Sequence, residues 1–387
     1  MRIHFVPSIQ PSYSTGIRAG LGEKSYNFYF LFYKYPRACL IAFRCVFYIV
    51  RVARRGAFLF GRVVDMAYKV LYPHDIGEKG REFLKSRGYE IKMGTGYDEE
   101  SLARDVVDVD AILAGSDPYT RRVLEAGKKL KVVARFGVGC DSIDMAAATE
   151  LGIQVTNAPL ANSNAVAEQA IALLMAAAKL VVFMDKAVRA GDWDPARDNN
   201  LSIEVMGKTL GLIGLGNIGR LVAKKAGLGL GMKILAYDPY LPADKYPEGV
   251  ERAASQEEVF AAADFLSLHM PSTPETRGTI NKSLFDLMKK GSVFINCARG
   301  DVVNEADLAT ALKNGPMSFA AVDVLVDEPP KADNPLLKLE NILILPHTAS
   351  YTPEAMDAMG MDSAKGIDEV LSGKQITWPV NKPAKKG

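Results

Sequence analysis

Residues 209–238 constrain the fold of this chain more than any other stretch. An apolar run at residues 210–213 predicts a short buried strand, which leads into Gly214-Leu215-Gly216-Asn217-Ile218-Gly219 and a helical pattern over residues 218–228. In such a unit the first glycine permits a tight turn, the second lets backbone approach a pyrophosphate, and the third lets the helix pack on the strand. Phosphates would then meet the positive end of the helix at Asn217 and Ile218. The stretch indicates a dinucleotide-binding unit.

The residue that ends the next predicted strand indicates which dinucleotide is bound. Residues 233–237 form that strand, and Asp238 follows it nineteen residues after Gly219. A carboxylate at this place can accept hydrogen bonds from the adenosine ribose. Pro239 and Tyr240 come next, with no Arg nearby to neutralise a 2′-phosphate, which the carboxylate would repel. The sequence therefore favours NAD over NADP.

The length and composition of the chain fit a folded protein of two domains. It has 387 residues, of which 48% are hydrophobic and 24% charged. The cysteines and histidines are dispersed, without Cys-x-x-Cys or His-x-x-x-His spacing: Cys39, Cys45, Cys140 and Cys297; His4, His74, His269 and His347. We therefore expect no disulfide framework, no metal site and a reducing, cytoplasmic location.

Charge is distributed unevenly along the chain. Residues 1–65 contain ten Lys and Arg against two acids, a net +8, so the remaining residues carry −6 of the overall +2. Because phosphate contacts need a basic face, nucleic-acid binding by the main fold is not expected.

The first 65 residues differ from the rest, since they hold fourteen of the chain's 33 aromatic residues. Their most apolar part, residues 38–50, is thirteen residues long and contains Arg44, which is too short and too polar for a membrane span. The segment also lacks the features of a secretory signal or a transit peptide. Two readings remain: a poorly ordered basic extension, or upstream sequence joined by a misplaced start, with Met66 as the natural first residue. The second is favoured, because strand-like order begins directly after Met66.

From Met66 onward, predicted strands alternate with helices. The strands of a first domain are residues 69–72, 90–93, 111–114, 131–135 and 154–156, with helices at residues 79–87 and 120–126 between them. A second set at residues 265–269, 292–297, 320–325 and 341–345 joins residues 210–213 and 233–237 to give six strands. The alternation predicts an α/β protein with two Rossmann-like, doubly wound parallel sheets.

Two long helices are expected to connect these domains. Residues 165–189 read as one helix between them, and residues 353–371 as a helix that returns to the first domain. A membrane span is not expected in the first of these, because Glu168, Lys179 and Asp185 interrupt it.

Ligands of open parallel sheets bind beyond the carboxyl ends of the strands, and this rule selects three residues. Arg299, Glu328 and His347 each follow a predicted strand end of the second domain. Reduction of a ketone by hydride needs a proton donor, a cation that holds a carboxylate, and a partner for the imidazole, and these residue types suit those roles. Each also has an ordinary structural explanation, such as capping a loop. His269 is the alternative acid, although it more plausibly lines the cofactor cleft.

Several of these motifs together resemble the D-isomer-specific 2-hydroxyacid dehydrogenase family, which includes D-3-phosphoglycerate, D-lactate, glyoxylate/hydroxypyruvate and formate dehydrogenases. The resemblance covers residues 66–383. It is carried by the glycine turn and by Arg135-Phe136-Gly137-Val138-Gly139, Asn164-Ala165-Val166-Ala167-Glu168, Asn296-Cys297-Ala298-Arg299-Gly300, Asp323-Val324, Glu328-Pro329 and Pro346-His347.

The resemblance implies a role for each matching residue. Arg299 would hold the substrate carboxylate with the amides of Val138 and Gly139, His347 would be the acid/base, and Glu328 its partner. Cofactor contacts would come from Gly214, Gly216, Asn217, Ile218, Gly219, Asp238, Cys297, Ala298 and Asp323.

The resemblance also implies a homodimer with a divided substrate domain. Residues 66–165 and 350–387 would form that domain, and residues 166–349 the NAD-binding domain. The expected activity is NAD-dependent hydride transfer to and from a small 2-hydroxy or 2-keto acid, with no nucleic acid or membrane as partner.

Two departures leave the substrate and the activity open. Ala114 stands where phosphoglycerate-specific members often place Arg, although Arg135 is retained, so the sequence leaves phosphate recognition undecided. Corepressors of the C-terminal-binding-protein type also resemble this family and keep an Arg, Glu and His set. An NAD(H)-binding protein with little turnover is therefore the alternative function.

Overall fold

The computed structural model describes residues 17–21, 24–28, 67–194 and 202–384. Contacts divide the chain into Met1–Met66 and Ala67–Gly387. In the first unit, β1 (Ile17–Leu21) pairs antiparallel with β2 (Lys24–Phe28). The two readings of the N-terminal extension otherwise concern residues outside those described, and they stay predictions.

Within Ala67–Gly387, one half is built on a five-stranded parallel sheet with the order β4-β3-β5-β6-β7. Its strands are β3 (Lys69–Tyr72), β4 (Glu90–Met93), β5 (Ala111–Ala114), β6 (Val132–Arg135) and β7 (Gln154–Thr156). All five predicted strands are present, with one boundary shifted by a residue. Both faces of the central strands are buried, as a parallel sheet covered by helices requires.

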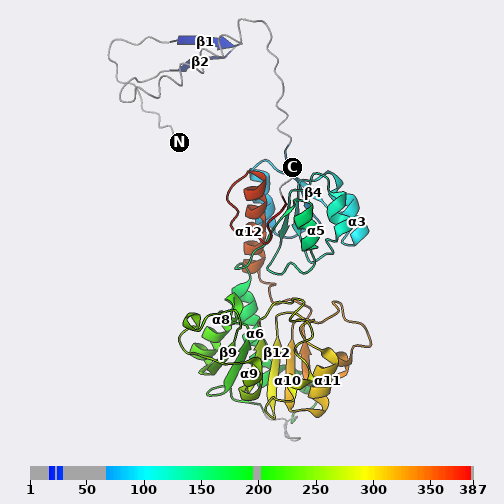
Figure 1. Cartoon of the computed structure of the whole chain (residues 1–387), viewed down its shortest axis with the longest axis vertical. Coiled ribbons are helices and arrows are strands. Elements are labelled where there is room, and N and C mark those ends of the chain that lie inside the picture. The colour runs from blue at the N-terminus through cyan, green and yellow to red at the C-terminus, as the bar shows by residue number, and fades with distance from the viewer. Residues whose placement is uncertain (1–16, 22–23, 29–66, 195–201, 385–387) are drawn as a thin grey trace, which may run out of the picture. The chain divides into compact units, whose positions relative to one another are not determined.

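Helices cover both faces of this sheet. One face carries α3 (Glu99–Asp105), α4 (Arg121–Ala126), α5 (Met145–Glu150) and the short helix η1 (Val106–Asp108). The other carries α2 (Glu78–Ser86) and α12 (Pro353–Leu371), which returns from the C-terminal end of the chain and is the red helix of Figure 1. A Cβ on Gly80 would lie 2.1 Å from the carbonyl oxygen of Gly360, so glycine lets α2 and α12 approach closely.

The other half is built on a seven-stranded parallel sheet with the order β10-β9-β8-β11-β12-β13-β14. Its strands are β8 (Thr209–Ile213), β9 (Lys233–Tyr237), β10 (Val250–Arg252), β11 (Phe265–Leu268), β12 (Ser292–Asn296), β13 (Met317–Val322) and β14 (Ile342–Ile344). The strand order reverses between β8 and β11, which is the place where doubly wound sheets bind ligands. The doubly wound α/β prediction is confirmed.

The predicted number of strands in this sheet was too low by one. β10 was missed because it is a three-residue edge strand with exposed Glu251 and Arg252, and therefore has no apolar run. The predicted strand at residues 320–325 was also placed too late. β13 ends at Val322, and the side chain of the next residue, Asp323, accepts hydrogen bonds from the backbone amides of Thr348 and Ala349.

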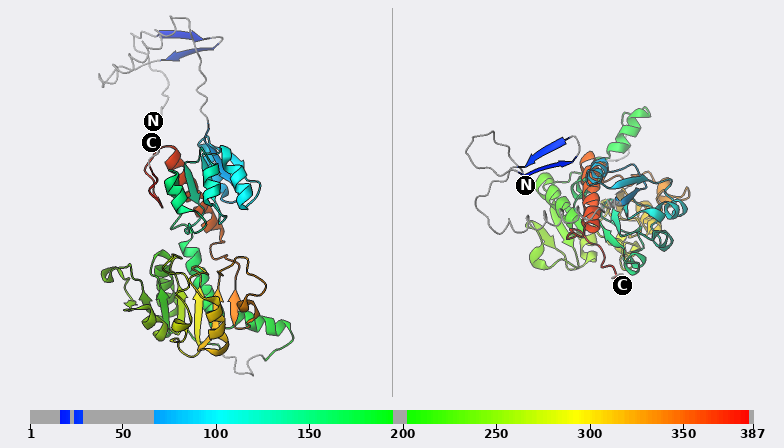
Figure 2. Two further views of the ribbon diagram at one scale, coloured as in Figure 1. Left: turned by 45° about the vertical axis from the view of Figure 1, so that its right-hand side comes forward. Right: turned by 90° about the horizontal axis from the view of Figure 1, so that it is seen from above.

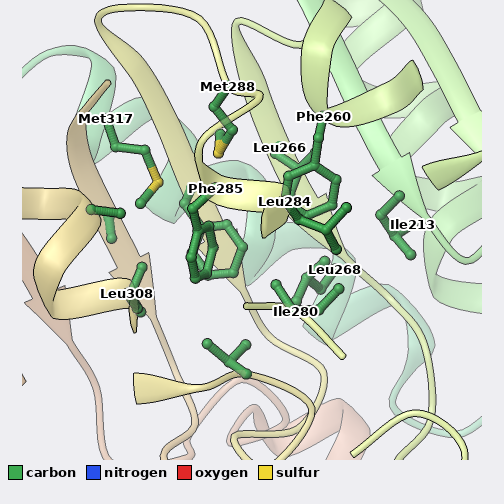
Figure 3. Packing of buried hydrophobic residues seen from close by; sticks show 14 of the residues in the cluster. Ile213, Phe260, Leu266, Leu268, Ile280, Leu284, Phe285, Met288, Leu308 and Met317 are labelled. Atoms are coloured by element: carbon green, nitrogen blue, oxygen red, sulfur yellow. The ribbon is translucent and has the colours of Figure 1, made fainter. Parts of the chain in front are cut away.

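Helices again cover both faces. One core gathers beneath α9 (Gln256–Ala262), α10 (Lys282–Phe285) and α11 (Glu305–Asn314), and Phe260, Phe285 and Leu308 belong to it (Figure 3). The Phe285 and Phe294 rings meet edge to face with centroids 5.6 Å apart. The opposite core lies beneath α6 (Ser163–Ala178) and α8 (Asn217–Lys224), which continues into the π-helical turn η3 (Lys225–Gly229). Short helices η4 (Ala243–Lys245) and η5 (Pro335–Lys338) complete this half.

The single helix expected over residues 165–189 is broken in two. α6 ends at Ala178, and α7 (Val181–Arg189) begins after Leu180, which adopts a left-handed φ of 52°. α7 buries none of its residues and extends away from the sheet (Figure 2). Among the described helices, none is by itself long and apolar enough to cross a bilayer; α6 and α7 pass that test only jointly, and they meet at a bend of 56°.

Candidate active site

A cavity of about 880 Å³ is lined by most of the predicted site residues, although Gly214, Gly219 and Asp238 are not among its lining residues. Its walls come from segments that follow the carboxyl ends of β3, β5, β6 and β7 in one sheet and of β8, β11, β12, β13 and β14 in the other. This is the location that the strand-end rule predicts for ligands of parallel sheets. The cavity lies between the two halves of Ala67–Gly387, so each half contributes its own side chains.

The glycine turn forms one wall of this cavity. Gly214 has φ 93°, and a Cβ there would lie 2.6 Å from the carbonyl oxygen of His269. A Cβ on Gly219 would lie 2.4 Å from the carbonyl oxygen of Gly214, so α8 packs directly on the turn. A Cβ on Gly216, by contrast, meets nothing within 4 Å. The turn is therefore closed on its protein side and open on its cavity side, where Asn217 and Ile218 begin α8.

Asp238 lies at the end of β9 and is held beside the glycine turn. One carboxylate oxygen accepts a hydrogen bond from the Leu215 amide at 2.8 Å, and the other accepts one from the Tyr240 amide at 3.0 Å. The carboxylate thus stands next to the turn, where a ribose joined to a bound pyrophosphate would lie. The open turn, the N-terminus of α8 and this acid together fit a dinucleotide.

His347 and Glu328 form a hydrogen-bonded pair that also lines the cavity. The His347 Nδ1 and Glu328 Oε2 atoms are 2.7 Å apart, and the Leu325 amide donates to the other Glu328 oxygen at 3.0 Å. Burial raises the pKa of the Glu328 carboxyl, but the hydrogen bond and charge of His347 more than offset this, so the net pKa lies below its usual range. Glu328 is therefore an anion that engages Nδ1 and leaves Nε2 of His347 for another partner.

Asp323 builds the turn that presents His347. Its carboxylate oxygens accept hydrogen bonds from the amides of Thr348 at 2.9 Å and Ala349 at 2.8 Å, and its carbonyl accepts one from the His347 amide at 2.8 Å. His347 itself has a left-handed φ of 54°. Burial raises the pKa of Asp323, although these backbone hydrogen bonds act in the opposite direction. Asp323 thus has a structural use beside the cofactor contact that the family resemblance implied.

Arg299 reaches across the cavity to the other half. Its Nε atom donates to Asp141 Oδ2 at 2.8 Å, and its Nη1 atom donates to the Ala298 carbonyl at 2.7 Å. Its Nη2 atom lies over Gly139, where an added Cβ would be 1.8 Å away. Sequence reasoning did not select Asp141. The only local signal was an acid two residues after Gly139, and its partner is 158 residues away.

The loop beneath Arg299 offers free backbone amides. Arg135 Nε donates to the Gly139 carbonyl and the Asn157 side chain donates to the Val138 carbonyl, both at 2.8 Å. Within the described part of the chain, the amides of Val138 and Gly139 donate to no protein acceptor. Two unbonded amides therefore lie next to the Arg299 guanidinium, and such donors suit a carboxylate.

Cys297 and Ala298 connect β12 to Arg299 and line the same cavity. Both are buried, and burial raises the pKa of the Cys297 thiol. The Asn296 side chain accepts a hydrogen bond from the Ala298 amide and donates one to the Arg299 carbonyl, each at 2.9 Å, so the last residue of β12 fixes the loop. A neutral, immobile loop is suited to a cofactor contact.

His269 is the alternative acid, and its surroundings do not favour that role. Its Nε2 atom is 3.0 Å from the Ser267 hydroxyl, and its buried Nδ1 atom has no hydrogen-bond partner among the described residues. Burial lowers the pKa of His269 to about 4, so near neutral pH the ring is uncharged. His269 lines the cavity beneath the glycine turn, as its sequence position suggested.

The chain is similar in sequence and in fold to known proteins. Residues 171–349 match the family described as D-isomer specific 2-hydroxyacid dehydrogenase, NAD binding domain. D-3-phosphoglycerate dehydrogenase of Methanocaldococcus jannaschii is 43% identical over 317 residues, which are 81% of this chain and 60% of that protein. The enzyme of the same name from Archaeoglobus fulgidus is 40% identical over 317 residues, 82% of this chain and 60% of that one. The chain thus spans about 60% of the length of these relatives.

The crystal structure of TT0316 protein from Thermus thermophilus has a similar fold. It superposes with a TM-score of 0.74 at 33% sequence identity, and the match covers 81% of this chain and 100% of that one.

Proposed function

The chain belongs to the D-isomer-specific 2-hydroxyacid dehydrogenase family, and we propose that it reversibly reduces a small 2-oxo acid to a D-2-hydroxy acid with NADH. One observation carries this proposal. A carboxylate-paired imidazole, His347, shares one cavity with the cation Arg299 and an open glycine turn. Hydride reduction of a 2-oxo acid needs an acid, a carboxylate clamp and a dinucleotide site together.

Residues on one side of the cavity would hold the dinucleotide. The turn Gly214–Gly216–Gly219, with Asn217 and Ile218 at the start of α8, faces the pyrophosphate, and Asp238 accepts from the adenosine ribose. Cys297, Ala298 and Asp323 line the end where the nicotinamide would lie. NAD, when bound, supplies or accepts the hydride.

The substrate carboxylate is held between the two halves. Arg299 places its guanidinium above Gly139, and the amides of Val138 and Gly139, which donate to no acceptor among the described residues, belong to the same cavity wall. This clamp fixes the ketone carbon and draws electron density from it, so that charge developing on the ketone oxygen meets a cation.

His347 provides the proton. Because Nδ1 is bound to Glu328, Nε2 is the atom that donates a proton to the ketone oxygen as the carbon takes up hydride. In the reverse direction Nε2 accepts the hydroxyl proton. Glu328 stays anionic throughout and orients the ring through its contact with Nδ1.

Loss of NADH absorbance on addition of a panel of small 2-oxo acids tests the proposal. Turnover with at least one of them is expected, and Arg299→Ala should reduce it. NADH binding without turnover of any 2-oxo acid would favour the NAD(H)-binding, corepressor-like alternative.

The remaining organisation is also proposed. Residues 66–165 and 350–387 would be the substrate domain, and residues 166–349 the NAD-binding domain. A homodimer is supported by α7, whose Val181 and Val188 are 54% and 45% exposed, and by Trp193 beyond it at 86%. Light scattering of the full chain and of Val181→Asp tests whether the protein is a homodimer.

The net charge of −6 outside residues 1–65 and the scattered cysteines support a cytoplasmic protein whose partners are small molecules, not nucleic acid or a membrane.

A further inference from the structure

The cavity contains a second carboxylate–imidazole pair that the mechanism above does not use. His74 follows β3 and Asp117 follows β5, and these strands are neighbours in the five-stranded sheet. Both residues line the cavity, on the wall contributed by the half that lacks the glycine turn. They therefore face the same space as the His347–Glu328 pair, from the other sheet.

Asp117 is held firmly by its surroundings. Its two carboxylate oxygens lie 2.7 and 2.8 Å from His74 Nε2, and the Tyr119 hydroxyl donates to one of them at 2.9 Å. That hydroxyl in turn accepts from the Gly115 amide at 3.1 Å. The Asp117 side chain is only 9% exposed, and Tyr119 is fully buried. The Asp117 carboxylate therefore fixes the orientation of the His74 imidazole.

The orientation of the His74 ring is fixed, and one of its two ring nitrogens has no hydrogen-bond partner among the described residues. Its ring stacks on Tyr97 with centroids 4.2 Å apart and planes 4° apart, and its side chain is 27% exposed. Asp117 occupies Nε2, and among the described residues nothing is hydrogen-bonded to Nδ1. With Nε2 donating to a carboxylate, Nδ1 of the neutral ring is an acceptor for a hydroxyl group.

A continuous wall connects this pair to the proposed carboxylate clamp. Ser116, next to Asp117, accepts a hydrogen bond from Arg135 Nη2 at 3.0 Å. The same guanidinium donates through Nε to the Gly139 carbonyl at 2.8 Å, and Gly139 lies against Arg299. If a substrate bound by its carboxylate at Gly139 and Arg299 extends along this wall, its C3 substituent reaches Ser116 and His74.

We propose that His74, fixed by Asp117, and Ser116 form a subsite for a hydroxyl group on C3 of the substrate. This inference rests on the proposed function and names its substrate class, the 3-hydroxy-2-oxo acids. An alkyl group on C3 would bury the polar atoms of His74 and Ser116 without forming hydrogen bonds to them. A site built for a hydroxyl group therefore discriminates against such an analogue. The Asp117 carboxylate disfavours a phosphate on the same carbon. Ala114, the last residue of β5, offers no guanidinium, and the guanidinium of Arg135 already donates to Ser116 and to the carbonyls of Phe136 and Gly139.

The test compares two isosteric substrates, hydroxypyruvate and 2-oxobutanoate, whose C3 substituents are hydroxyl and methyl. At saturating NADH, the kcat/KM of the unaltered protein should favour hydroxypyruvate by about tenfold or more. His74→Phe keeps a flat ring on Tyr97 but removes Nδ1, so it should lower that ratio by about tenfold and change kcat/KM for 2-oxobutanoate less than about threefold. Asp117→Asn should shift the ratio in the same direction.

Tyr97→Phe is the matched control, since Tyr97 does not line the cavity and the ring stack survives. It should keep the original ratio. Equal kcat/KM values for both substrates in the unaltered protein, a preference for 3-phosphohydroxypyruvate over both, or an equal loss with both in His74→Phe would overturn the subsite and leave the dehydrogenase function standing. Failure of every 2-oxo acid to oxidise NADH would instead overturn the proposed function, and the subsite with it.

Discussion

Arg299 Nε donates to Asp141 Oδ2 at 2.8 Å, and this contact joins the two halves of the cavity. Arg299 follows β12 of the seven-stranded sheet, whereas Asp141 belongs to the loop after β6 of the five-stranded sheet. The pair leaves Nη2 of Arg299 over Gly139, facing the free amides of that loop. The orientation of the proposed carboxylate clamp therefore depends on a residue from the opposite domain.

Asp141→Asn keeps the shape of this contact and removes its charge. We expect KM for a 2-oxo acid to rise about tenfold because the guanidinium loses its fixed orientation, while the NADH dissociation constant stays unchanged. Steady-state kinetics and NADH fluorescence titration measure the two effects. Glu150→Gln is the control, because Glu150 accepts from Arg121 at the same 2.8 Å on the exterior. An equal change in both variants would show that Asp141 does not orient Arg299.

Gly139→Ala tests the close approach of Arg299 to the loop. The new Cβ would lie 1.8 Å from Arg299 Nη2 and 2.7 Å from Asp141 Oδ2, so both side chains must move. Since they are the ends of flexible side chains, we expect kcat/KM to fall by about 10²-fold while thermal stability changes little. Gly229→Ala, where a Cβ meets nothing within 4 Å, should retain full activity. Normal kinetics in Gly139→Ala would contradict the assigned clamp.

His269 should make stability depend on pH. Its pKa is about 4 in the folded protein and 6.5 as the ordinary value, so the unfolded chain takes up the proton first as pH falls. The stability that the neutral ring contributes is therefore complete above pH 6.5 and is lost as pH falls toward 4, by about 2 kcal/mol at pH 5. Urea unfolding measures the free energy of unfolding of the unaltered protein and of His269→Gln. The difference between these two free energies should be about 2 kcal/mol smaller at pH 5 than at pH 7.5. A constant difference would contradict the low pKa.

Local sequence patterns predicted most of the fold for a clear physical reason. Buried parallel strands are short apolar runs, and the glycine turn has a fixed spacing, so both are visible in a few consecutive residues. β10 was missed because an exposed edge strand needs no apolar run. The break at Leu180 was missed because a leucine with φ 52° is not marked by Gly or Pro, and packing imposes it.

The candidate site likewise contains residues that local sequence patterns predicted and residues that they did not. Arg299, Glu328 and His347 were selected because each follows a strand, and the structure places all three on one cavity. Asp141 and the His74–Asp117 pair were missed, because their partners lie 158 and 43 residues away and no local pattern encodes such a contact.

Asp238 is expected to set the dinucleotide preference. Its carboxylate is fixed by the Leu215 and Tyr240 amides and would repel a 2′-phosphate, so NADH should bind more tightly than NADPH. Fluorescence titration with both dinucleotides measures the difference, and Asp238→Ala should narrow it. Equal affinities in the unaltered protein would be incompatible with the assignment.

The central claim is that His347 donates the proton, and the reduction rate of His347→Ala tests it most directly. With NADH and a good 2-oxo acid, kcat/KM should fall by about 10²- to 10⁴-fold at every pH, because a general acid is lost, while NADH binding is retained. Glu328→Gln, which keeps the hydrogen-bonding shape but not the charge, should show a smaller loss. The account is contradicted if His347→Ala keeps a near-normal rate and His269→Ala is the inactive variant.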